Sequence, residues 1–160
     1  MKRALILIVS HAIALAVGFG LGVYFLPILV APSAPAEPEL AAAREEALFT
    51  GEFRRDLPGS DAFHWGEGRV YIGRDSIALE GKLAPGPDYK LYLSPEYVET
   101  NADFERVKPR MVRVTDIKTF ENFLVPVPDF IDPADYNAVI IWCETFSMFI
   151  TAARYQPAEG

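Results

Sequence analysis

Two side chains in this sequence have the chemistry of a redox or metal-binding site, namely Cys143 and His64. Cys143 is the one cysteine of the chain and follows Trp142, and His64 stands directly before Trp65. Thiolate and imidazole are common ligands of copper and of haem iron, and a thiolate can also be oxidised on its own. We therefore take Cys143 as a redox candidate and Cys143 with His64 as a candidate pair for copper or haem. The spacing does not show whether the two meet, and it identifies no metal.

Each of these residues also has a structural alternative. Cys143 closes an unbroken apolar run, 138–143, and free cysteine is among the most frequently buried residue types, so it could be an inert packed thiol. His64 precedes a strand, where a polar side chain often hydrogen-bonds the backbone of a loop. Both alternatives stay open from the sequence alone.

Other functions lack the residues that they need. One cysteine and one histidine after residue 31 leave no cluster for a zinc site or for a nucleophile with its base. That part of the chain holds 13 of the 15 basic residues and all 22 acidic ones, so its formal charge is −9, which argues against nucleic acid as a partner. The composition favours an electron-transfer or binding module over a turnover enzyme.

The candidate site belongs to the part of the chain that lies after an apolar N-terminal segment. Residues 4–31 contain no charged side chain and predict a single transmembrane anchor, longer than the roughly 30 Å of hydrocarbon requires. Lys2 and Arg3 place the N-terminus in the cytoplasm, and so the rest in the periplasm or outside the cell. Ala34-Pro35-Ala36 keeps cleavage as a signal peptide open.

A Pro- and Ala-rich linker is predicted for residues 32–44, semi-extended because of its prolines. Residues 45–156 then predict one all-β domain. Apolar residues alternate in 68–73 and 76–80, and strand-like runs occur at 89–94, 111–117, 121–127, 138–143 and 147–155, with a polar crossing at 95–110. Pro126 and Pro128 limit the run at 121–127 to a sheet edge or to an early end. This pattern is typical of an antiparallel β-sandwich or a barrel-like domain.

Four segments in this order resemble the DM13 domain: 51–53 (GEF), 64–72 (HWGEGRVYI), 86–93 (GPDYKLYL) and 135–153 (DYNAVIIWCETFSMFITAA). The resemblance covers roughly residues 50–155. It implies a β-sandwich-like domain outside the cytoplasm with a redox role. In that role Cys143 would be a bare thiol or the ligand of a prosthetic group such as haem, and His64 would be the motif histidine. Animal members often carry companion domains, so we expect this chain to use a separate redox or protein partner.

We therefore expect a membrane-tethered extracytoplasmic electron-transfer module that uses Cys143, either as a bare thiol or together with a bound haem or metal. The alternative is a non-catalytic binding or assembly domain on the same anchor, in which Cys143 is structural.

Overall fold

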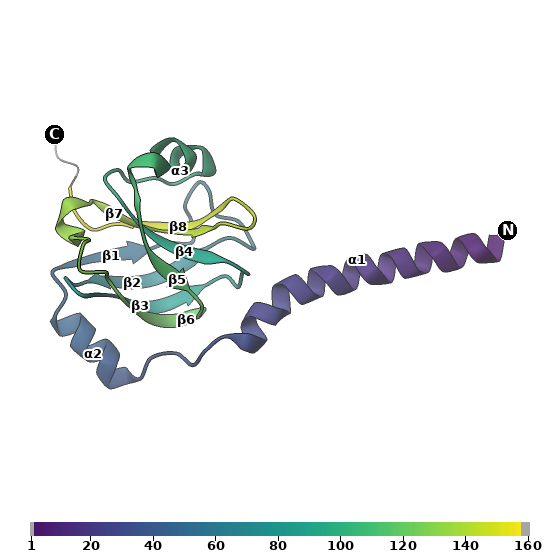
Figure 1. Cartoon of the computed structure of the whole chain (residues 1–160), viewed down its shortest axis with the longest axis horizontal. Helices are drawn as coiled ribbons and strands as arrows, with labels where there is room; N and C mark the ends of the chain where they lie inside the picture. Colours follow the sequence, from purple (N-terminus) through teal and green to yellow (C-terminus); the bar gives the residue numbers. More distant parts are fainter. Residues whose placement is uncertain (1, 158–160) are drawn as a thin grey trace.

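The computed structural model describes residues 2–157, which form a long N-terminal helix followed by a β-sandwich (Figure 1). The first sheet has the order β1-β2-β3-β6 and the second β5-β4-β7-β8, and all neighbouring strands are antiparallel. Within residues 2–157 no strand of one sheet pairs with a strand of the other, so the fold is a sandwich and not a closed barrel. The elements are α1 (Lys2–Val30), α2 (Glu37–Glu45), β1 (Phe49–Phe53), β2 (Gly66–Ile72), β3 (Ser76–Leu83), β4 (Tyr89–Ser94), α3 (Asn101–Val107), the 3₁₀ turn η1 (Lys108–Arg110), β5 (Val112–Ile117), β6 (Glu121–Pro126), the 3₁₀ turn η2 (Pro133–Asp135), β7 (Ala138–Cys143) and β8 (Met148–Arg154).

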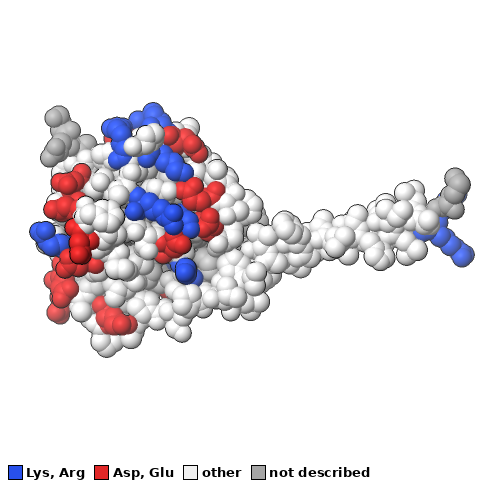
Figure 2. All heavy atoms as spheres, in the orientation of Figure 1, with Lys and Arg blue, Asp and Glu red and all other residues white. Residues whose placement is uncertain are grey.

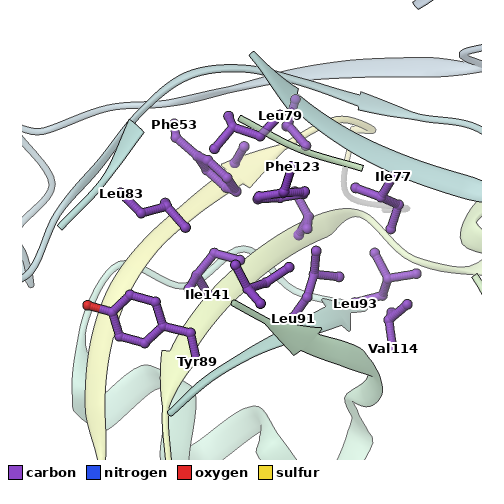
Figure 3. Close-up of a cluster of buried hydrophobic side chains, with 14 of the residues drawn as sticks. Phe53, Ile77, Leu79, Leu83, Tyr89, Leu91, Leu93, Val114, Phe123 and Ile141 are labelled. Atoms are coloured by element: carbon purple, nitrogen blue, oxygen red, sulfur yellow. The ribbon is translucent and has the colours of Figure 1, made fainter. Parts of the chain in front are cut away.

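The alternating residues of the strands fill the space between the two sheets, as predicted. Val70 and Ile72 on β2 are fully buried, and so are Ile77 and Leu79 on β3. Figure 3 shows Leu79, Phe123 and Phe53 from the first sheet facing Leu91 and Ile141 from the second. β6 lies at an edge of the first sheet, as the prolines indicated.

The predicted polar crossing at 95–110 contains a helix instead. Thr100 begins α3 by accepting a hydrogen bond from the backbone N–H of Asp103 at 3.1 Å. Phe104 and Val107 lie three residues apart, on one face of the helix, and both are fully buried. Phe104 stacks on Trp142 with ring centroids 3.8 Å apart. α3 therefore covers the outer face of β7, which is buried on both faces.

The predicted semi-extended linker also differs, because residues 37–45 form helix α2. Alanine favours helix, and the Glu39 carboxylate accepts a hydrogen bond from the Ala36 N–H at 2.8 Å at the helix start. Leu40 and Ala43 share one face and are buried against Tyr71 and Ala78 on the outside of the first sheet. Only residues 31–36 between α1 and α2 remain outside regular structure.

α1 is exposed along its length, and it is long and apolar enough to cross a membrane, a character that an N-terminal signal sequence shares.

The antiparallel order places the loops 54–65, 84–88, 118–120 and 144–147 together at one end of the sandwich. Pro27 and Val30 of α1 border a pocket with Pro87 and Ile117 at this end, which we call the α1 end.

The loops 73–75, 95–111 and 127–137 lie at the opposite, distal end. The chain also leaves the sandwich there. The Tyr155 N–H donates to the Asn137 carbonyl at 3.0 Å, and the Tyr155 hydroxyl donates to the Pro133 carbonyl at 2.8 Å. The last described residues are thereby held against the distal end.

If α2 is part of the folded unit, Leu40→Ala should lower the free energy of unfolding of the full chain by about 2–5 kcal/mol, the usual cost of truncating a buried leucine. Leu48→Ala is the matched control, because Leu48 is 53% exposed and its change should stay within about 0.5 kcal/mol. Denaturant titration in detergent, followed by tryptophan fluorescence, measures both. Equal stability of the two variants would show that α2 contributes nothing to the domain.

Candidate functional site

Cys143 and His64 line the same pocket, which has a volume of about 140 Å³ and lies at the α1 end. His64 precedes β2 in the first sheet, and Cys143 is the last residue of β7 in the second. Both positions fall at the same end of the sandwich because of the strand directions. The structure thus places in the lining of one pocket two residues whose proximity the spacing could not show. The other lining residues are Gly20, Val23, Tyr24, Phe63, Pro85, Gly86, Pro87, Tyr89 and Phe146.

Cys143 is only 2% exposed and also belongs to the core between the sheets. Burial raises the pKa of its thiol above the ordinary value, while hydrogen bonding from the backbone of Phe146, Asp88 and Thr145 acts in the opposite direction. Burial prevails, so at neutral pH the free side chain is a neutral thiol. A bound cation would favour the thiolate, because a metal displaces the proton of its thiol ligand.

His64 is oriented by Asp61. The Nδ1 atom of His64 lies 2.8 Å from Oδ2 of Asp61, and the backbone N–H groups of Phe63 and His64 donate to Oδ1 at 2.7 and 2.9 Å. The hydrogen bond from His64 lowers the pKa of the Asp61 carboxyl, which therefore stays an acceptor. An acceptor at this position favours the tautomer with the proton on Nδ1. Nε2 then carries the lone pair of a metal ligand, and a carboxylate behind a ligating histidine is the common arrangement at metal sites.

The structural alternative for His64 is a hydrogen bond from its side chain to loop backbone, and the side chain instead contacts the Asp61 carboxylate. The backbone of His64 does take part in the turn, because its carbonyl accepts a hydrogen bond from the Asp61 N–H at 2.9 Å. The two roles are compatible, because the turn uses the backbone and Nδ1 and leaves Nε2 free of a role in it.

The pocket does not fit a haem. Sites for ligands and cofactors commonly have volumes of about 300–1,000 Å³, well above that of this pocket. In residues 2–157, no group of three or more His, Cys, Asp and Glu side chains is placed to hold a metal ion. One thiol and one imidazole nevertheless suit Cu(I), a soft ion for which thiolate is a preferred ligand.

Tyr89 is a residue of this pocket that the sequence reasoning did not identify. It begins β4, pairs with Cys143 across the sheet and is 2% exposed. Burial, together with the nearby Cys143, raises the pKa of the Tyr89 hydroxyl, so this group is neutral at physiological pH. The Gly-Pro-Asp-Tyr strand start was visible in the sequence, but only the register with β7 shows its relation to the thiol.

A second polar group lies next to the site. The Tyr92 hydroxyl donates to Glu144, and Lys108 Nζ donates to the same carboxylate at 3.0 Å. Tyr92 belongs to the buried cluster with Trp142 and Phe104, under α3. This ion pair therefore covers the outer side of β7 at Glu144, which is the residue directly after Cys143.

The comparisons with known proteins agree with this geometry. A family model described as electron transfer DM13 matches residues 52–155, which include both sheets almost completely, His64 and Cys143. Neither the curated proteins nor the solved structures gave a match.

We expect the native thiol to react more slowly with iodoacetamide than the thiol of the denatured chain at every pH between about 7 and 9. The thiolate is the reacting form, and burial both raises its pKa above the ordinary 9.0 and blocks access. The rate should be followed by mass spectrometry of the full chain in detergent. A native rate at pH 7 equal to or above the denatured rate would mean that the backbone N–H groups outweigh burial and that Cys143 is a reactive bare thiol.

Proposed function

We propose that this chain, which belongs to the electron transfer DM13 family, is a membrane-tethered extracytoplasmic electron-transfer module whose redox site is the Cys143–His64 pocket. The observation that carries the proposal is the convergence of the chain's one cysteine and the family-motif histidine in one pocket. The two residues come from different sheets, and their meeting is not required by the packing of either sheet alone.

The environment of Cys143 favours a ligand over a bare thiol. Its pKa is raised by burial, so oxidation through a free thiolate would be slow near neutral pH. Cys143 and His64 are the residues that would hold a soft cation, and such a cation would compensate the charge of the thiolate. A bound copper ion would supply a one-electron change of oxidation state. The protein would contribute Cys143 and His64 as ligands, the Asp61 carboxylate that orients His64, and an apolar surround.

α1 supports the membrane attachment. It has 29 residues, about 43 Å at 1.5 Å per residue, and roughly 20 residues suffice to span the hydrocarbon. Lys2 and Arg3 precede the apolar stretch, and such basic residues are retained on the cytoplasmic side. The sandwich would then lie in the periplasm or outside the cell, and its electron partner would be a separate protein or small molecule.

A second candidate function rests on the burial of the thiol. Cys143 packs with Val139, Ile141 and Met148 in or against the core, as a structural cysteine would. In that case the domain is a non-catalytic binding or assembly module, and Cys143→Ser would lower the free energy of unfolding by about 1–3 kcal/mol through an unpartnered hydroxyl. The protein would also bind no copper at this pocket.

The electron-transfer proposal predicts that the full chain in detergent binds one Cu(I) ion, measured by competition with a chromophoric Cu(I) chelator. Cys143→Ser and His64→Gln should each remove this binding, because each deletes one of two ligands. Asp61→Asn should weaken it by about 10- to 100-fold, the usual effect of removing the partner of a ligating histidine.

His11→Gln is the matched control, since His11 is the other histidine of the chain and lies in α1. Its substitution should leave the affinity unchanged. An affinity that is the same in Cys143→Ser and in the unmodified chain would place copper elsewhere and refute this site. A complete lack of binding, together with a native thiol that reacts only in denaturant, would favour the structural role.

The orientation predicts that a thiol placed between α1 and α2 is reached only from outside the cytoplasmic membrane. Ser33→Cys in the Cys143→Ser background offers one exposed thiol. A maleimide that cannot cross membranes should label it in intact cells. Labelling only after the membrane has been opened would reverse the topology.

A further inference from the structure

We propose that the α1 end of the sandwich rests on the outer leaflet of the membrane, with Phe63 and Phe146 inserted at its surface, so that the Cys143–His64 pocket opens toward lipid. This inference rests on the proposed attachment through α1 and is independent of the redox chemistry at Cys143.

The loops at the α1 end expose apolar side chains and no charge at their tips. Phe63 is 67% exposed and Phe146 51% exposed. The tips 62–63, 84–87, 119–120 and 145–147 contain no charged residue. Figure 2 shows the part of the domain next to α1 largely free of Lys, Arg, Asp and Glu, which gather toward the distal end and over α3. Charged residues of the same loops, among them Asp61, Asp88, Lys118 and Glu144, flank these tips. Exposed aromatic residues at such tips are typical of a surface that meets the interface of a bilayer.

The length of α1 sets these loops at the depth of that interface. If the span begins after Arg3, the roughly 20 residues that cross the hydrocarbon end near Val23, and Tyr24 and Phe25 fall where aromatic residues anchor helices. Val23 and Tyr24 line the same pocket as Phe63, Phe146 and Cys143. The loop tips therefore lie level with the outer boundary of the hydrocarbon.

A second, strongly apolar hollow gives the same depth. It lies between Phe19, Val23 and Leu26 of α1 on one side and the loops on the other, where Pro87, Thr145 and Phe146 line it. At this depth the hollow would face acyl chains and headgroups. Lipid is the occupant that its apolar lining and its position along α1 both favour.

The short connection keeps the loops at the membrane. Residues 31–36 reach at most about 20 Å when fully extended, and α2 fixes the next residues to the first sheet. Such a tether holds the α1 end near the bilayer at an effective concentration on the order of millimolar, so two phenylalanines can bind a surface that would not retain a free domain. The exported charge of −9 means that the contact is apolar and does not depend on attraction to anionic lipid.

The test uses four phenylalanines of the full chain in its native membrane, each replaced singly by a photocrosslinking residue. The variants are Phe25→p-benzoylphenylalanine in α1, Phe63→p-benzoylphenylalanine and Phe146→p-benzoylphenylalanine at the α1 end, and Phe130→p-benzoylphenylalanine at the distal end. Phe130 is the matched control because it is 84% exposed and lies in the loop 127–137. After illumination, mass spectrometry separates phospholipid adducts from protein adducts.

We expect phospholipid adducts at positions 25, 63 and 146 and none at 130. Adducts at 25 but not at 63 or 146 would overturn the docking while leaving the membrane anchor in place. Protein adducts alone at 63 and 146 would show that a partner or a second copy covers this end, which also overturns the proposal. A lack of lipid adducts at 25 as well would refute the anchor, and the docking with it.

Discussion

The burial of β7 on both faces is the constraint on which the rest of the domain depends. Its inner residues, Val139 and Ile141, pack against the first sheet, and its outer residue Trp142 stacks under Phe104 of α3. A strand held on both sides cannot shift by one residue without placing its whole inner set on the outer face. The position of Cys143 at the end of this strand is therefore fixed by the core.

The same constraint explains the character of the candidate site. A residue that closes a buried strand is desolvated before it meets any ligand, and this raises the pKa of the Cys143 thiol. The loops at the α1 end supply the compensating groups, namely backbone N–H groups around the sulfur and an imidazole set by a carboxylate. The site thus combines a sulfur atom that is part of the packed core with a histidine that is held by a loop.

The sequence predicted most of the sheets, because alternation is a local signal in the strands from 68 to 80, and an unbroken apolar run marks the strand from 138 to 143. It did not predict α2 or α3, since their buried faces consist of two residues each, Leu40 with Ala43 and Phe104 with Val107, and such pairs become meaningful only against a sheet. β1 was not identified as a separate strand, because it has five residues and only Phe53 among them is buried. For the site, residue type alone indicated Cys143 and His64, whereas Asp61 and Tyr89 required the turn geometry and the strand register, which are set by contacts between distant parts of the chain.

The sandwich begins and ends at its distal end, where the ring of Phe49 at the start of β1 lies 5.5 Å from the ring of Tyr155 after β8. Asn137 and Pro133 hold Tyr155 there, whereas α1 lies at the opposite end (Figure 1). The loops around Cys143 therefore lie at the end of the sandwich opposite to both the start of β1 and the end of β8. A polypeptide fused at the end of β8 would start on the side away from the pocket that Cys143 and His64 line.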